Sequence, residues 1–390
     1  MSFDLEKKIT TAHIPRASGS TILASDTLNV VYNKYKSTAA IPTDAIRYNL
    51  IFSHGTGMNK SIWHYHIKSL FEWSQKSNGK IYIDSVIAID AAGHGDSGVI
   101  NRNKLGWIFR WDEGGKDIIE VVRNEHRTTG DFQNNFKSRN ILIGHSMGGF
   151  SSLLAAFYEP DLFDATVPIE PVVYLDSRST RKFSQRFSII GKMIINEFDT
   201  KQAFEDFFKV HSFYKNIDPK VMDDFLNDEL LEVIDPKTKD VKYRIKSSSQ
   251  AQMAGYVSSA LVLPLGMDIY KHIRVPIAHV IGKNAKWNPP ESTEFFRGSV
   301  NPDFLAATYD IEGGEHLVNA EKPDDLLEVL KDFILKRKVE FKSTAAQLPE
   351  QKAEGLRQKV FESEIPKLLN GDLGTLYGIQ HTALAKASKL

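Results

Sequence analysis

The chain has 390 residues, of which 42% are hydrophobic and 25% charged, and these values are typical of a globular protein with a large core. The formal net charge is zero, so a phosphate backbone is not an expected partner and nucleic-acid binding is not predicted. Cysteine is absent, which excludes disulfides, thiol nucleophiles and thiolate metal sites.

The two ends of the chain predict the cellular location of the protein. Residues 1–8 lack the apolar run of a signal peptide, and no stretch approaches the roughly 18 apolar residues of a spanning helix, so no transmembrane segment is expected. The last three residues, Ser388, Lys389 and Leu390, form the tripeptide that is read as a peroxisomal address. We therefore expect a protein of the peroxisomal matrix, recognised by the import receptor through this tripeptide.

Strand and helix patterns alternate along most of the chain. Residues 1–25 are expected to be irregular and residues 27–36 to form a strand. Buried strands are predicted at 48–53, 85–90, 140–143, 165–170, 276–282 and 306–311, and helices at 62–71, 111–125, 150–157 and 324–338. This alternation predicts an α/β protein with a mostly parallel central sheet and helices on both faces, whose strand ends form the working crevice.

One insertion interrupts the alternation. Residues 174–272 are rich in charged and aromatic side chains and contain no buried-strand run, yet sheet elements lie on both sides of them. We interpret this segment as a mainly helical cap inserted after strand 6, the strand at residues 165–170. The expected organisation is an N-terminal segment with the first strands at 1–44, a core in two parts at 45–173 and 273–340, the cap at 174–272, and a helical extension with the targeting tail at 341–390.

The most informative motif is Gly144-His145-Ser146-Met147-Gly148, which follows a buried strand and precedes a helical pattern. Strand, Gly-x-Ser-x-Gly and helix together are the context of a nucleophile elbow. A side chain at Gly144 or Gly148 would collide with the neighbouring strand or helix. The bare pattern alone would be better explained by a serine capping a helix, but the flanking strand and helix favour a nucleophile.

A serine nucleophile needs a base and an oxyanion hole. His316 is the candidate base, because it lies after the last strand and before the last helix, behind Gly313 and Gly314. The amides of Met147 and of Thr56, in the His-Gly-Thr-Gly loop at 54–57, are the expected oxyanion donors.

The sequence identifies the orienting acid less clearly than the nucleophile and the base. No carboxylate follows the strand at 276–282, where the sequence continues from Lys283 to Trp287. Glu170 ends the preceding strand and is the candidate, with Asp176 in reserve. A surface salt bridge is the alternative explanation for Glu170.

Two other patterns are rejected as cofactor or metal sites. Residues 93–98 fit Gly-x-Gly-x-x-Gly, but residues 99–106 open no clear amphipathic helix and no second strand ends in an acid at the required spacing, so no nucleotide cofactor is expected. His64 and His66 are too close together for a helical metal pair, and no matching acid cluster accompanies them, so no metal is expected.

The motifs at 54–57, 90–97, 144–148 and 313–316 together resemble the α/β-hydrolase superfamily over about residues 45–340. Within it, the segments at 169–172 and 284–290 and the terminal Ser-Lys-Leu are similar to fungal peroxisomal lipases and related hydrolases. Some superfamily members carry the acid after the sixth strand, which fits Glu170. The resemblance implies an esterase for acylglycerols or phospholipids with Ser146 as nucleophile and His316 as base, without a cofactor.

Other functions stay open at this point. An acyl-CoA thioesterase or an acyltransferase would use the same residues, because the motifs do not indicate which molecule accepts the acyl group. A non-catalytic binding protein that kept this fold is the third alternative. The substrate expected in each enzymatic case is a lipid or another acyl ester.

Overall fold

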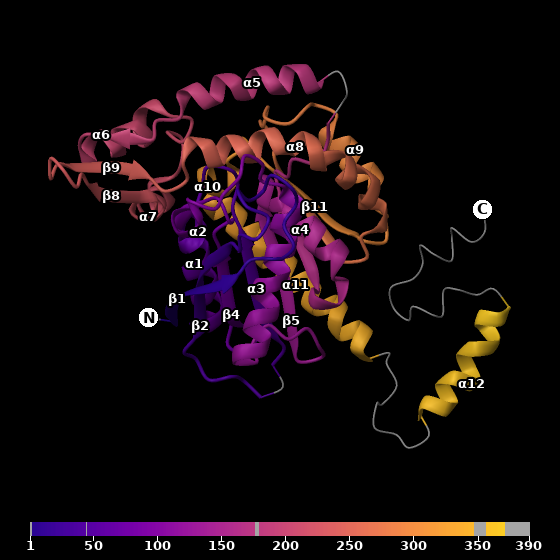
Figure 1. The fold of residues 1–390 in the computed structure, drawn as a ribbon. Coiled ribbons are helices and arrows are strands. Elements are labelled where there is room, and N and C mark those ends of the chain that lie inside the picture. The colour runs from indigo at the N-terminus through magenta and orange to yellow at the C-terminus, as the bar shows by residue number, and fades with distance from the viewer. Residues whose placement is uncertain (1, 44, 176–178, 347–355, 371–390) are drawn as a thin grey trace.

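The computed structural model describes residues 2–43, 45–175, 179–346 and 356–370 (Figure 1). Its centre is an eight-stranded sheet in the order β1-β2-β4-β3-β5-β6-β10-β11. The strands are β1 Phe3–Thr11, β2 Asn29–Ser37, β3 Arg47–Ser53, β4 Tyr82–Ile89, β5 Ser138–His145, β6 Ala165–Ile169, β10 Ile277–Gly282 and β11 Leu305–Ile311. β1 and β2 run antiparallel to their neighbours, and every pairing from β4 to β11 is parallel. The predicted mostly parallel sheet is confirmed.

Helices cover both faces of this sheet. The core helices are α1 His64–Lys76, α2 Gly95–Asn101, α3 Trp111–Thr129, α4 Met147–Tyr158, α9 Ser292–Ser299, α10 Val318–Glu321 and α11 Pro323–Ala346, and α12 Leu356–Leu369 lies beyond them. Leu50 and Phe52 of β3 pack into the cluster under α1 and α11, whereas Ile51 packs into the cluster under α3 and α4. Since successive side chains of a strand point to opposite faces, a strand covered on both sides reads as a continuous apolar run.

The cap, which we define as residues 179–272, lies between β6 and β10 and sits over one end of the sheet (Figure 1). It consists of α5 Ser179–Met193, β7 Glu197–Phe198, α6 Lys201–Asp206, a π-helical turn Phe207–His211, α7 Pro219–Glu229, β8 Leu230–Ile234, β9 Val241–Ile245 and α8 Ser249–Ile269. The insertion after strand 6 is confirmed. The mainly helical interpretation missed a three-stranded antiparallel sheet, β7-β9-β8, because its short strands are mostly half-buried and give no buried run.

A buried cluster of charges ties the cap to the core. The ammonium of Lys60, in the 3₁₀ turn Lys60–Trp63, is fully buried and lies 2.9 Å from Asp90, 2.9 Å from Asp96 and 2.7 Å from Asp228 of α7. Asp96 also accepts a hydrogen bond from Lys246 of the cap. Removing one partner would leave an uncompensated buried charge, which typically costs about 3–5 kcal/mol, so this cluster fixes the cap in place.

One local expectation is wrong. Residues 1–25 were expected to be irregular, but Phe3–Thr11 forms the edge strand β1. Leu5 and Ile9 of this strand are 51% and 60% exposed, so it buries too little to show an apolar alternation. The Gly-rich motif at 93–98 overlaps the start of the short helix α2, which has seven residues and ends at Asn101.

One helix is long and apolar enough to cross a membrane by length and composition. It runs over Ser249–His272, and 56% of its most apolar stretch is buried inside the protein. The expectation that no stretch of the chain has this character is therefore wrong. α8 packs against α3, α4 and α5, and this burial explains its apolar composition as that of a core helix.

Candidate active site

Ser146 lies on a strained turn between β5 and α4. Its backbone has φ 53° and ψ −116°, a conformation that residues other than glycine rarely adopt, and its amide donates to Ile169 O at 2.9 Å. The side chain lines a cavity of about 250 Å³. The turn therefore presents the Ser146 hydroxyl at the end of the sheet, next to the N-terminus of α4, where negative charge is stabilised.

The two flanking glycines are required by close packing. A Cβ on Gly144 would collide with the carbonyl oxygen of Gly148, and a Cβ on Gly148 would lie 2.5 Å from Ser53 O. The steric role predicted for these glycines is confirmed.

Gly148→Ala is expected to lower the free energy of unfolding by about 1–3 kcal/mol or more, because β3 and α4 must move apart to admit the methyl group. Ester hydrolysis should fall as well, since the movement displaces the loop that follows Ser53. Gly298→Ala is the matched control, because a Cβ there meets nothing within 4 Å. Denaturant unfolding of both variants measures the effect, and equal stability would contradict this role.

His316 connects the Ser146 hydroxyl to a buried carboxyl group. Its Nε2 lies 3.0 Å from Ser146 Oγ, and its Nδ1 lies 3.2 Å from Glu170 Oε2. With the hydrogen on Nδ1, the imidazole donates to Glu170 and accepts from the hydroxyl, which is the arrangement of a general base with an orienting acid. The structure thus brings together Ser146, His316 and Glu170 from widely separated parts of the chain.

Glu170 follows β6 in a left-handed conformation, φ 42°, and is only 3% exposed. The amide of Gly282, at the end of β10, donates to its Oε1 at 2.8 Å, and Asn288 Nδ2 donates to its Oε2 at 3.3 Å. Burial raises the pKa of Glu170 to about 8, and the two hydrogen bonds oppose that rise. This carboxyl group is buried beside the imidazole, so the surface salt bridge considered as its alternative is wrong. Asp176, the reserve acid, lies outside the described residues.

The loop after β3 forms the opposite wall of the cavity. His54 is buried, accepts from the amide of Ala91 at 3.1 Å and donates from Nδ1 to Gly55 O at 2.8 Å. Burial lowers the pKa of His54, so it supports the loop as a neutral ring. The Thr56 hydroxyl lies 3.4 Å from Met147 Sδ, which puts the two residues predicted as oxyanion donors in contact beside Ser146.

A tyrosine of the cap also holds this loop. Tyr214 is buried, and its hydroxyl donates to Gly57 O at 2.7 Å. A Cβ on Gly57 would clash with that hydroxyl, so the glycine allows the cap to approach the loop.

Two residues that hold His316 were not predicted from the sequence. The ring of Trp287 stacks on the imidazole, with centroids 5.0 Å apart and planes at 15°. His145 Nε2 lies 2.8 Å from His316 O, and because a carbonyl only accepts, His145 carries its hydrogen on Nε2. Burial lowers the pKa of His145 to about 3, so it stays neutral and fixes the His316 backbone. Both residues lie in segments that the sequence motifs include, at 144–148 and 284–290, but nothing in the sequence indicates that they contact His316.

Core and cap residues line the cavity together. They are Gly55, Thr56, His145, Ser146, Phe213, Tyr256, Trp287, Glu315, His316, Leu317 and Glu321. Burial raises the pKa of Glu321 to about 7, although Oε2 of this residue accepts a hydrogen bond from the Glu315 amide. Apolar and aromatic side chains around one hydroxyl and one imidazole suit acyl transfer to serine from a largely apolar substrate.

No group of three or more His, Asp or Glu side chains among residues 2–43, 45–175, 179–346 and 356–370 is arranged to hold a metal ion. The tripeptide Ser388, Lys389 and Leu390 lies outside the described residues.

Comparisons with known proteins identify chains of similar sequence and fold. The chain is 28% identical over 345 residues to the peroxisomal membrane protein LPX1 of Saccharomyces cerevisiae, covering 85% of this chain and 87% of that one. The solved structure of the yeast peroxisomal alpha-beta-hydrolase Lpx1 superposes with a TM-score of 0.78 at 26% identity, covering 95% and 99% of the two chains. The resemblance to fungal peroxisomal hydrolases is confirmed, and so is the peroxisomal location at the level of the organelle.

A type I acyl-CoA thioesterase of Penicillium brevicompactum, mpaH', is 25% identical over 170 residues, which are 43% of this chain and 36% of that enzyme. A family model described as the alpha/beta hydrolase family matches residues 50–329. That match spans more than half of the chain and includes the cap together with the parts of the sheet that carry Ser146, Glu170 and His316. The chain therefore belongs to the alpha/beta hydrolase family.

Proposed function

We propose that this hydrolase cleaves carboxylic esters of lipids, acylglycerols or phospholipids, with Ser146 as nucleophile, His316 as base and Glu170 as orienting acid. The observation that carries the proposal is the chain of contacts from Ser146 Oγ to His316 Nε2 and from His316 Nδ1 to Glu170 Oε2, at 3.0 and 3.2 Å, within one cavity.

In the proposed reaction, Ser146 Oγ attacks the ester carbonyl while His316 Nε2 takes the hydroxyl proton. The amides of Met147 and Thr56 stabilise the oxyanion of the tetrahedral intermediate. His316 then gives its proton to the leaving alcohol, which departs and leaves an acyl-Ser146. Water attacks this ester with His316 again as base, and His316 returns the proton to Ser146 Oγ as the fatty acid is released. Throughout, the ionised form of Glu170, whose fraction grows as the pH rises toward 8, holds the imidazole and offsets its positive charge.

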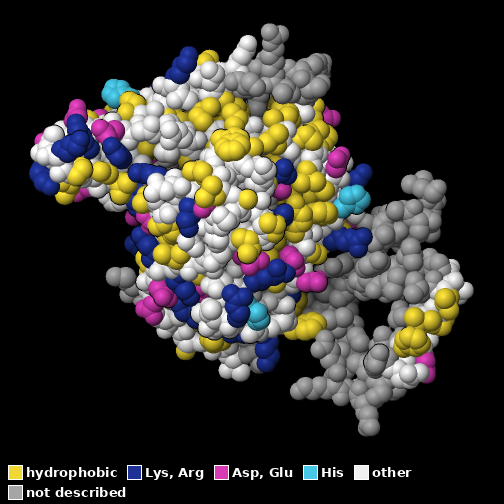
Figure 2. Space-filling model, in the orientation of Figure 1, with side chains coloured by type: hydrophobic (Ala, Val, Ile, Leu, Met, Phe, Trp, Pro, Cys, Tyr) yellow, Lys and Arg dark blue, Asp and Glu magenta, His cyan; other side chains and the backbone are white. Residues whose placement is uncertain are grey.

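The cap supplies an apolar environment for the acyl chain. Phe213, 41% exposed, lines the catalytic cavity and also a smaller neighbouring cavity of about 30 Å³. The smaller cavity is lined mainly by apolar cap residues such as Ile194, Phe207 and Phe208. Figure 2 shows hydrophobic side chains along the cap over α5 and α8, where Ile189 and Leu261 are exposed, and charged side chains at the β8–β9 tip. These features favour a lipid over a small polar ester.

Phe213→Ala is expected to shift the preference toward longer chains, because it removes a ring that lines both cavities and so enlarges the space for the acyl chain. The ratio of kcat/KM for a long-chain ester to that for a short-chain ester should rise about tenfold, in line with the effect of methylene groups in apolar pockets. Val210→Ala is the control, since Val210 is 59% exposed and lines neither cavity. An unchanged chain-length profile would show that the acyl chain takes another path.

A panel of substrates tests the proposed function as a whole. Hydrolysis is measured with triacylglycerols, phospholipids and esters of graded chain length, and in parallel with acyl-CoA and with an added alcohol acceptor. Ester hydrolysis that exceeds thioester cleavage and acyl transfer is the expected result. Faster cleavage of acyl-CoA would favour the thioesterase, an alternative suggested by the relative mpaH'. No turnover of any acyl substrate would favour a binding protein.

The place of action is proposed as the peroxisomal matrix. The support is the terminal Ser388-Lys389-Leu390, through which the import receptor would recognise the chain. Deletion of these three residues from the protein expressed in yeast should leave it in the cytosol, and protease protection of purified peroxisomes distinguishes matrix from membrane surface.

A further inference from the structure

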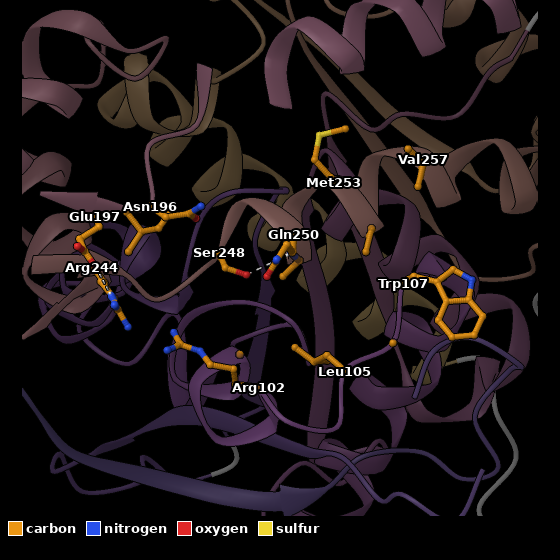
Figure 3. Close-up of a pocket in the computed structure, with 15 residues that line it drawn as sticks. Arg102, Leu105, Trp107, Asn196, Glu197, Arg244, Ser248, Gln250, Met253 and Val257 are labelled. Atoms are coloured by element: carbon orange, nitrogen blue, oxygen red, sulfur yellow. Dashed lines mark hydrogen bonds and ion pairs between the residues drawn. The ribbon is translucent and has the colours of Figure 1, made fainter. Parts of the chain in front are cut away.

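A second cavity lies where the cap meets the core, apart from the catalytic cavity (Figure 3). Its volume is about 720 Å³, within the range of roughly 300–1,000 Å³ that is common for small-molecule sites. Core residues that follow α2 form one wall, and cap residues around β7, β9 and the start of α8 form the other. The two cavities share no lining residue, so a ligand here would not occupy the catalytic residues.

The lining separates into a charged end and an apolar end (Figure 3). Arg102 and Arg244 lie at one end of the cavity, and Trp107 and Val257 lie at the other. Trp107 is 69% exposed and Val257 is 52% exposed, so this apolar end of the cavity is open to solvent. An uncovered apolar wall beside a cationic end matches an amphiphile with an anionic head.

The charges at the cationic end leave one guanidinium free. Arg244 Nε donates to Glu197 Oε2 at 2.7 Å, so this pair is neutral. No described residue forms a hydrogen bond or an ion pair with the guanidinium of Arg102. The cavity lining contains Arg102, Arg244 and Glu197 as its charged residues, which gives a net charge of +1. A guanidinium with free donors can bind a carboxylate through two parallel hydrogen bonds.

We propose that this cavity binds the anion of a long-chain fatty acid, with its carboxylate on Arg102 and its chain along Leu105, Trp107 and Val257. A single negative charge matches the single unpaired cation, and one unbranched chain matches the one apolar wall. Because core and cap each contribute lining, the bound acid joins the two and stabilises their contact. This binding requires neither Ser146 nor His316, so it stands apart from the proposed catalysis.

Palmitate is the probe, titrated calorimetrically into the full-length protein below its critical micelle concentration. Hexadecanol and hexadecyl phosphate serve as the neutral and phosphate-headed counterparts. Palmitate is expected to bind to one site, and Arg102→Ala is expected to weaken it by about 10–100-fold, as expected for loss of a charged hydrogen-bond partner. Arg127→Ala, on an exposed position of α3 outside the cavity, should leave the affinity unchanged.

A second pair of variants tests the apolar end. Val257→Glu introduces a carboxylate into the cavity and should abolish palmitate binding, whereas Leu261→Glu places the same charge one turn along α8, 54% exposed and outside the lining. Palmitate should raise the melting temperature of the native protein and of Leu261→Glu, but not of Val257→Glu.

Equal palmitate affinity in Arg102→Ala and the native protein would overturn the proposal. Equal binding of hexadecanol would also overturn it, because no anion would then be selected, and preference for hexadecyl phosphate would replace the carboxylate by a phosphate head. Ester hydrolysis by Arg102→Ala, assayed separately, should be retained, which distinguishes failure of this site from failure of the proposed catalysis.

Discussion

Ser146→Ala is expected to reduce kcat/KM for ester hydrolysis by about 10⁴-fold or more. The variant lacks the only hydroxyl that contacts His316 Nε2 among the described residues, so no acyl-enzyme can form there. The fold should persist, because alanine fits the space of serine and the strained turn is held by the Ser146 amide and the two close-packed glycines.

Ser152→Ala is the matched control for this loss. Ser152 lies on α4, the helix that follows Ser146, is fully buried, and its hydroxyl has no hydrogen-bond partner among the described residues. Its removal should leave kcat/KM within a few-fold of the native value. If the Ser146→Ala protein still hydrolyses the ester at close to the native rate, Ser146 is not the nucleophile.

Glu170→Gln is expected to lower kcat by about 10³–10⁴-fold while raising stability at alkaline pH. The Gln amide would donate to His316 Nδ1 and thereby favour the tautomer with a hydrogen on Nε2, which faces Ser146 and could no longer accept its proton. One substitution would therefore have opposite effects on catalysis and on folding.

The stability change follows from the direction of the pKa shift. The pKa of Glu170 is about 8 in the folded protein against an ordinary value of 4.5, so the folded state favours the protonated carboxyl. Its contribution to stability is fully present below pH 4.5 and is lost as the pH rises toward 8. Glu170→Gln cannot ionise, so above pH 8 it should be more stable than the native protein, on the order of 2–4 kcal/mol.

Denaturant unfolding between pH 4 and 9, together with kcat, measures both effects. Glu321→Gln is the control, because Glu321 lines the same cavity with a pKa of about 7 but makes no hydrogen bond to His316. It should keep kcat within a few-fold. If the free energies of unfolding of the native protein and of Glu170→Gln run parallel across this pH range, burial does not favour the protonated form of the Glu170 carboxyl group.

Ser146 could be predicted as the candidate nucleophile because the geometry of its turn depends on residues that are close in the sequence. The elbow at Ser146 needs glycines on both sides and a strand and a helix at fixed distance, all within about a dozen residues of sequence, and the buried strands read as apolar runs. His316 could be found for a similar reason, since its place between the last strand and the last helix follows from the order of elements.

Other features depend on contacts between distant segments, which single-sequence patterns do not record. Lys60 reads as an ordinary surface lysine, yet it is buried among carboxylates from three other parts of the chain. The stacking of Trp287 on His316 and the hydrogen bond from Tyr214 to Gly57 arise only when the cap and loops close on the core. The strand β1 is mostly exposed, and β8 and β9 are mostly half-buried, so none of them has a clear alternation of apolar and polar residues.

Covalent labelling with a fluorophosphonate, followed by peptide mapping, tests the central claim most directly. We expect a single adduct on Ser146 in the native protein, no adduct in Ser146→Ala, and labelling slowed by orders of magnitude in His316→Ala. An adduct on another residue, or none in a folded native protein, would contradict the assignment of Ser146 and His316 as the reacting pair.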